Sequence, residues 1–216
     1  MASAKAFSIL NDLDLEKTKK EKIFRLIWNL LVVMAKVEMR SLSERNLETY
    51  SSKIKLWKIQ TESIDPKTCM EIGAIIGNGS TDQIKNLGKY GSSLGEILGL
   101  VNDFRVSTNL TLELVNKIKQ KTLPFALLLA SERSISLKKR IDVLLTKKKI
   151  DKTSIKLVVE DMLETNVLAD IEKKVVICVQ RAKEAIESLN QNKATQTLQT
   201  FIELQPRFFA ESICLL

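Results

Sequence analysis

All seven glycines of this 216-residue chain lie between Gly73 and Gly99. Four of them recur at helical spacing and would share one face of a helix: Gly88, Gly91, Gly95 and Gly99. Because a glycine inside a helix costs about 1 kcal/mol relative to alanine, four on one face need a compensating contact. This glycine stripe predicts either the close approach of a neighbouring helix or an open cavity for a ligand beside it.

The rest of the chain favours helices. It has three prolines, and alternating strand patterns do not occur, so few breaks interrupt its apolar periodicity. Ser80 followed by Gln83 predicts a capping box that opens the glycine-rich helix, and Pro66 and Pro124 predict a helix start and a helix interruption. We expect an all-α fold, one domain over residues 1–216, as a bundle of about eight to ten helices. The further helices are expected over residues 17–46, 68–76, 136–149, 153–164, 166–190 and 192–204.

Composition excludes several classes of function. The chain contains no histidine, which excludes Ser-His-Asp and Cys-His nucleophile activation and the common zinc sites. The net charge is +8, and its lysine clusters read as solvated helix ends or as a surface for an anionic partner. Nucleic acid is not expected, because these clusters lack interleaved aromatic residues. No apolar run is long enough for a transmembrane segment and no signal peptide pattern is present, so we expect a cytoplasmic protein.

Three segments carry a resemblance to a known family. Residues 72–77 read IGAIIG, residues 87–95 read LGKYGSSLG, and residues 121–128 read KTLPFALL. In this order they resemble the trans-isoprenyl (polyprenyl) diphosphate synthases, in which LGAILAG leads to FGxxLGxxFQxxDDxxD and then to KxTLPLL. The resemblance implies a helical bundle of the isoprenoid-synthase type that lacks the leading helices of the family.

The resemblance also implies a position for a metal site. In the family, the aspartates of DDxxD hold Mg²⁺ ions that bridge a diphosphate. Here the first aspartate corresponds to Asn102, the second to Asp103 and the last to Val106. The pair Asn102 and Asp103 is therefore a remnant that implies at most a weak Mg²⁺ site, and the alternative is a buried or capping role for Asp103.

Diphosphate contacts are implied at two other places. The Lys-Thr pair of the family corresponds to Gln60 and Thr61, and the lysine before Thr-Leu-Pro corresponds to Lys119 or Lys121. Glutamine supplies hydrogen bonds without charge, and charge-assisted hydrogen bonds are roughly twice as strong. Lys119 and Lys121 have an alternative role as part of a solvated connecting segment.

These replacements favour a non-catalytic role and leave the question of activity open. We expect a degenerate polyprenyl-synthase-like protein of isoprenoid biosynthesis, an accessory subunit in a homo- or hetero-oligomer with a prenyl-synthase-like subunit, and an isoprenoid diphosphate as its ligand. The alternatives are an active prenyltransferase completed by a partner chain, and a basic helical scaffold. The apolar stripe of the helix at 17–46 is the expected pairing face: Ile23, Leu26, Ile27, Leu30 and Leu31.

Overall fold

The structure, a computed structural model, describes residues 2–43, 51–108, 112–120, 122–147 and 150–214. These residues form twelve α-helices and no strand. The bounds are α1 Ala2–Asp12, α2 Lys17–Ser43, α3 Ser52–Glu62, α4 Ile64–Ile76, α5 Thr81–Thr108, α6 Leu112–Lys119, α7 Phe125–Arg133, α8 Ile135–Thr146, α9 Lys152–Glu164, α10 Val167–Glu187, α11 Lys193–Glu203 and α12 Gln205–Cys214. The expected all-α, single-domain bundle is confirmed.

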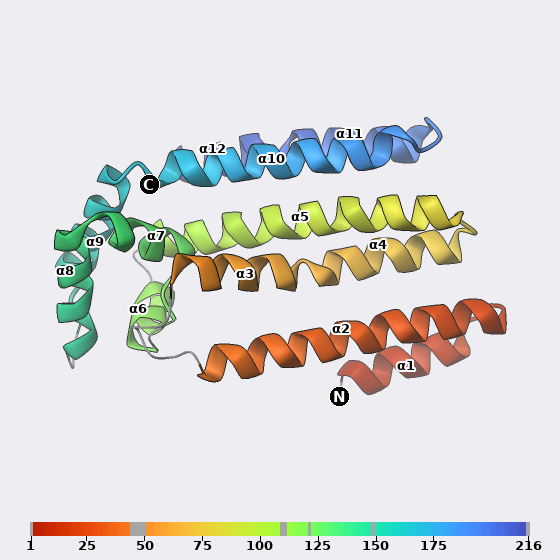
Figure 1. The fold of residues 1–216 in the computed structure, drawn as a ribbon, viewed down its shortest axis with the longest axis horizontal. Coiled ribbons are helices and arrows are strands. Elements are labelled where there is room, and N and C mark those ends of the chain that lie inside the picture. Colours follow the sequence, from red (N-terminus) through yellow and green to blue (C-terminus); the bar gives the residue numbers. More distant parts are fainter. Residues whose placement is uncertain (1, 44–50, 109–111, 121, 148–149, 215–216) are drawn as a thin grey trace.

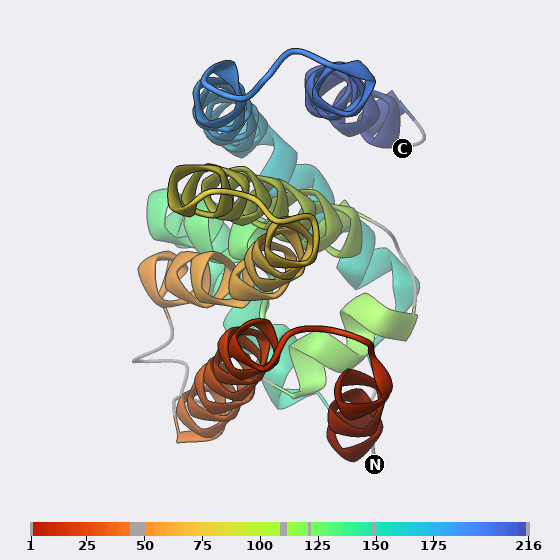
Figure 2. The same cartoon turned by 90° about the vertical axis from the view of Figure 1, so that its right-hand side faces the viewer.

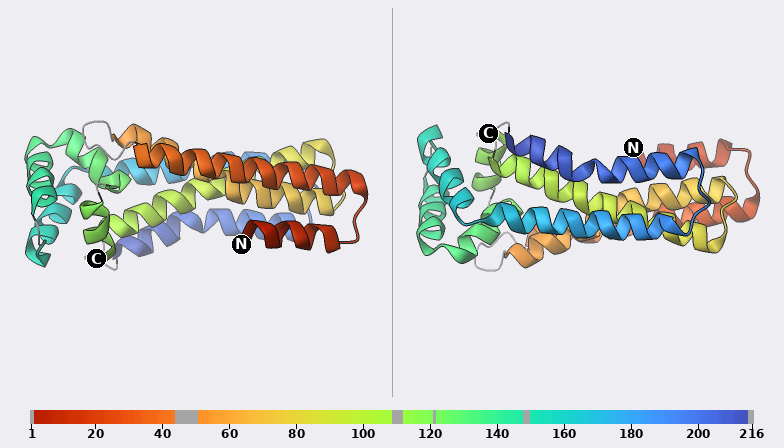
Figure 3. Two further views of the ribbon diagram at one scale, coloured as in Figure 1. Left: turned by 90° about the horizontal axis from the view of Figure 1, so that it is seen from below. Right: turned by 90° about the horizontal axis from the view of Figure 1, so that it is seen from above.

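The long helices run in layers along one axis, with α5 at the centre (Figures 1 and 2). Helices α3 and α4 cover one side of α5, and α10 covers the other. Beyond α3 and α4 lie α1 and α2, while α11 and α12 lie beside α10 in its layer (Figure 2), and α8 and α9 lie across one end (Figure 3). None of the described helices combines the length and the apolar content that a membrane crossing requires.

The glycine stripe lies against α3 and α4. A Cβ atom added at Gly91 would lie 2.5 Å from the carbonyl oxygen of Pro66, and one added at Gly95 would lie 2.8 Å from Cα of Ser63. The same addition at Gly99 would lie 2.7 Å from Cγ2 of Ile59. These distances are too short for a real Cβ, so the absence of side chains is what allows α5 to approach α3 and α4.

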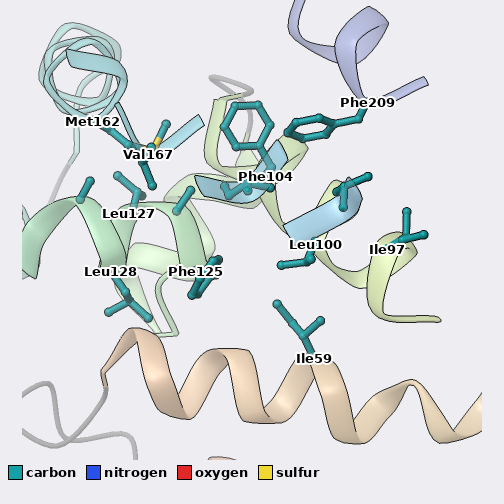
Figure 4. Close-up of a cluster of buried hydrophobic side chains, with 14 of the residues drawn as sticks. Ile59, Ile97, Leu100, Phe104, Phe125, Leu127, Leu128, Met162, Val167 and Phe209 are labelled. Atoms are coloured by element: carbon teal, nitrogen blue, oxygen red, sulfur yellow. The ribbon is translucent and has the colours of Figure 1, made fainter. Parts of the chain in front are cut away.

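The main core lies around the second half of α5. Phe104 faces Phe209 of α12 (Figure 4), with ring centroids 5.4 Å apart and ring planes at 62°. Helix α7 inserts its apolar residues beside them, and Leu127 has no exposed surface. Offset and edge-on aromatic packing of this kind contributes beyond the area it buries.

A second apolar cluster joins the N-terminal helices to α4. It is built on Leu10 of α1, Ile23 of α2 and Ile75 of α4. Ile23 keeps only 2% of its surface exposed, so the expectation that this residue belongs to an uncovered pairing face was wrong. Helix α1 folds back over that position, and this contact could not be read from the periodicity of α2 alone.

Two of the expected helix boundaries, at Ser80 and at Pro124, are confirmed. The backbone N–H of Ser80 donates to Oε1 of Gln83 at 2.8 Å, and the N–H of Gln83 donates to Oγ of Ser80 at 3.2 Å, which is the expected capping box. Pro124 ends the break before α7, as expected. By contrast, α4 begins at Ile64 rather than at Pro66, because a proline is tolerated throughout the first helical turn. The twelve helices of the described residues exceed the expected eight to ten, in part because a further helix, α12, follows α11 directly after Leu204.

Candidate functional site

A small polar cavity of about 180 Å³ lies between α3, α5 and α6. It occupies the position at which the resemblance places the aspartate-rich motif, because Asn102, Asp103 and Val106 line it. The charged residues of its lining are Lys55, Lys58, Glu62, Asp103, Glu113 and Lys117. Three ammonium groups therefore face three carboxylates, and the cavity carries no net positive charge.

Lys55 and Asp103 form the central contact of this cavity. The Nζ atom of Lys55 lies 2.7 Å from Oδ1 of Asp103, and the two side chains keep 11% and 13% of their surface exposed. Oδ2 of the same carboxylate accepts a hydrogen bond from the backbone N–H of Phe125. Both oxygens of Asp103 are therefore bonded to groups of this chain.

The bond to Phe125 explains why a carboxylate is useful here. Phe125 is the first residue of α7, and the preceding Pro124 has no polar side chain with which to cap that helix. Asp103 caps α7 from α5 instead, and a negative charge is favourable beside the N-terminal end of a helix. Helix α3 has a similar arrangement, because Glu132 of α7 accepts hydrogen bonds from the N–H and the hydroxyl of Ser52 at 2.7 and 2.6 Å.

The residues present do not fit a Mg²⁺ ion at this position. Oδ1 of Asn102 accepts from Arg105 at 3.1 Å, and Val106 has no ligand atom in its side chain. Mg²⁺ requires oxygen ligands in near-octahedral geometry, and the ammonium of Lys55 already neutralises Asp103. Within the described ranges, no three side chains of the Asp, Glu, His and Cys types lie close enough together to surround a metal ion.

Lys58, which lines the cavity, forms ion pairs within α3 and with α2. Its Nζ atom lies 3.5 Å from Glu62, one turn along α3, and 3.3 Å from Glu38 of α2. Next to this pair, the guanidinium of Arg40 lies 4.2 Å from the ring centroid of Trp57. The Lys58–Glu38 and Arg40–Trp57 contacts both connect α2 to α3. Lys58 therefore helps to hold these two helices together.

Gln60 donates a hydrogen bond to a carboxylate of α5. Its Nε2 atom donates to Glu96 of α5 at 2.9 Å, and Glu96 also accepts from Arg181 of α10 at 2.7 Å. Burial raises the pKa of the Glu96 carboxyl, but hydrogen bonds from Gln60 and Arg181 outweigh it and hold that pKa below its ordinary value. Arg181 also donates to Sγ of Cys178 at 2.8 Å, and burial together with Glu96 raises the pKa of that thiol to about 11.

The other expected diphosphate contacts do not gather at the cavity. The hydroxyl of Thr61 donates to the carbonyl of Trp57 at 2.7 Å. Lys119 is exposed at the end of α6, and Lys121 lies outside the described residues. Lys117 lines the cavity in their place, and its position one turn after Glu113 was the sequence signal that could have identified it.

Several solved structures share this fold. A geranylgeranyl pyrophosphate synthetase from Pyrococcus horikoshii Ot3 matches with a TM-score of 0.79 and 16% identity, over 94% of this chain and 63% of that protein. A decaprenyl diphosphate synthase from Rhodobacter capsulatus matches with a TM-score of 0.75 and 17% identity, over 88% of this chain and 60% of that protein. A geranylgeranyl pyrophosphate synthase from Lactobacillus brevis ATCC 367 matches with a TM-score of 0.76 and 14% identity, over 93% of this chain and 62% of that protein.

These matches establish what kind of bundle the chain forms. The expected resemblance to the prenyl diphosphate synthase fold is confirmed by structures that are 14% to 17% identical in sequence. The chain spans about three fifths of the length of these proteins, 60% to 63%. No protein-family model and no curated protein matches the sequence.

Proposed function

We propose that this chain is a non-catalytic accessory subunit of a prenyl diphosphate synthase, acting in isoprenoid biosynthesis in the cytoplasm. In this role it pairs with a second prenyl-synthase-like subunit, and an isoprenoid diphosphate is the ligand of the assembly. Support for the isoprenoid context comes from the fold, which the chain shares with synthases of long and short prenyl diphosphates.

The observation that carries the non-catalytic role is the contact between Lys55 and Asp103. Ionising an allylic diphosphate requires several positive charges, held in advance where charge develops on the leaving group. Here the carboxylate that would hold a metal ion is bonded to an ammonium at 2.7 Å and to a helix N-terminus. A cation could bind only by displacing Lys55, which would leave a mostly buried ammonium without its partner.

The expected behaviour of the isolated chain is testable directly. The purified protein is given radiolabelled isopentenyl diphosphate, an allylic diphosphate and MgCl₂, and the extracted products are counted. We expect no elongation by the chain alone. Elongation that is lost in Asp103→Ala would contradict the proposal and favour an active prenyltransferase.

The accessory role needs a second measurement. The tagged chain is purified from its native source, and the bound proteins are identified and assayed for prenyl transfer. We expect to recover an active trans-prenyl diphosphate synthase whose rate or product length changes when this chain is removed. Recovery of partners with no prenyl-transfer activity would favour the alternative of a basic helical scaffold.

A further inference from the structure

A second and larger cavity lies at the far end of the bundle from Asp103. It has a volume of about 410 Å³ and is bounded by α4, the start of α5, the link from α10 to α11, and α11 itself. Leu87 of its lining precedes Asp103 by 16 residues, which places the two about 24 Å apart along α5. Figure 2 looks onto the end of the molecule that holds both the turn between α4 and α5 and the link after α10. We call this space the end cavity.

The end cavity is lined by apolar and small residues. Met70, Leu87, Leu189 and Leu198 supply its large apolar side chains. None of the lining residues that the structure describes carries a charge, although 28% of the chain is charged. A charged ligand would therefore meet no opposite charge in the lining and would lose part of its hydration to apolar side chains.

Gly73 of α4 lines the end cavity on a side that is exposed to solvent. A Cβ atom added at Gly73 would meet no atom within 4 Å, and the residue lies on the solvent-exposed side of α4. At Gly91 the same addition would lie 2.5 Å from the backbone of α4, so helix packing accounts for that glycine. No neighbouring helix that the structure describes contacts Gly73 in this way, so the space beside it is open to solvent and accessible to a ligand.

The polar groups of the lining are amides that retain hydrogen-bond donors. Oε1 of Gln83 accepts from the N–H of Ser80 at 2.8 Å. Oδ1 of Asn192 accepts from the N–H groups of Ala194 and Thr195 at 2.9 and 3.0 Å. Gln83 is partly buried and Asn192 is exposed. Within the part of the chain that the structure describes, the NH₂ groups of these two amides make no hydrogen bond to protein, so each can donate to water or to an acceptor on a ligand.

We propose that the end cavity binds an uncharged, mainly apolar small molecule with a hydrogen-bond acceptor oxygen at one end. The volume of about 410 Å³ lies within the range of roughly 300–1,000 Å³ that is usual for small-molecule sites. Apolar surface supplies the affinity, and the amide donors of Gln83 and Asn192 orient the oxygen. The proposal does not depend on the function proposed above, because the end cavity shares no residue with the Asp103 cavity.

The test uses Nile red, an uncharged apolar dye with a carbonyl oxygen, and a graded series at Gly73. Gly73→Ala adds one atom to open space and is the control, whereas Gly73→Leu and Gly73→Phe fill progressively more of the end cavity. We expect wild type and Gly73→Ala to bind the dye with equal affinity. The affinity of the two larger variants should be lower by at least about tenfold. Unfolding midpoints at or above that of wild type would show that the variants fold.

A second measurement uses Cys69, an exposed thiol in the lining. Its alkylation by N-ethylmaleimide is followed with and without decan-1-ol, and Cys69→Ser identifies its share of the reaction. We expect decan-1-ol to slow alkylation and displace the dye, and decanoate to need about tenfold higher concentration because of its charge. Equal dye affinity across the Gly73 series would overturn the proposal, as would unprotected Cys69. Slower alkylation of Cys69 at higher protein concentration, with no effect of decan-1-ol, would also overturn it and would mean that a second copy of the chain covers the end cavity.

Discussion

Replacing Lys55 with methionine keeps the side chain unbranched and close to its original length but removes the ammonium group. Asp103 is then left with one partner, the backbone N–H of Phe125. Its carboxylate stays in a cavity of about 180 Å³, where 13% of its side-chain surface is exposed. The expected result is a loss of stability, because an uncompensated charge is left mostly buried.

The magnitude follows from burial. Removing one partner of a buried ion pair typically costs about 3–5 kcal/mol. Since the two side chains keep 11% and 13% of their surface exposed and water can enter the polar cavity, we expect the lower end, about 3 kcal/mol. For a chain of this size that corresponds to a fall of about 6–12 °C in the unfolding midpoint.

The assay is denaturant and thermal unfolding of a double-mutant cycle with Lys55→Met and Asp103→Asn. Asparagine retains an oxygen to accept from Phe125 while removing the charge. We expect a coupling energy of about 2 kcal/mol between the two sites. The matched control is Lys58→Met in the same helix and cavity. Its ion pairs are longer and involve carboxylates with 37% and 61% exposure, so a loss below about 1 kcal/mol is expected.

Two results would refute this reasoning. Equal losses for Lys55→Met and Lys58→Met would mean that burial does not distinguish the two lysines. A coupling energy near zero would mean that Lys55 and Asp103 do not interact in solution. We also expect MgCl₂ to leave the unfolding midpoint of wild type unchanged, and a clear increase would show that a cation displaces Lys55 after all.

Three further predictions follow from the same structure. Gly91→Ala is expected to destabilise the fold by about 1–3 kcal/mol through overpacking, and Gly73→Ala to stabilise it by about 0.4–1 kcal/mol. If the two variants changed the free energy of unfolding in the same direction, the packing described for α5 would be contradicted. The pKa of Glu96 is lower in the folded protein than its ordinary value of 4.5. Its ionised carboxylate therefore contributes fully to the free energy of unfolding above pH 4.5, and this contribution is lost as the pH falls through the lower pKa of the folded state. Glu96→Gln should therefore flatten stability against pH in that acidic range, and an unchanged acid profile would exclude this cause. The pKa of about 11 for the buried thiol of Cys178 predicts that at pH 8 a thiol reagent modifies Cys69 first and reaches Cys178 only on unfolding, which mass spectrometry of the labelled peptides would check.

The sequence determined the features of this protein that depend on neighbours within one or two helical turns. The capping box of Ser80 and Gln83, the break at Pro124 and the glycine stripe all arise from spacings of three or four residues, and helix geometry fixes what such spacings do. The order of the glycine-rich and Thr-Leu-Pro segments also predicted the kind of bundle, which the solved structures share. The sequence left open the choice between close packing and an open cavity beside the stripe, and the role of Asp103.

That choice and the candidate site were decided by the tertiary structure. Lys55 and Asp103 lie 48 residues apart in the sequence, and their contact depends on how closely α5 approaches α3 across the glycines. Gln60 donates to Glu96, which lies 36 residues later in the sequence, and the periodicity of α3 alone does not specify that contact. The end cavity brings together residues near positions 73 and 192, and no local pattern specifies that meeting. Side chains so distant in sequence meet only when the packed helices fix their positions.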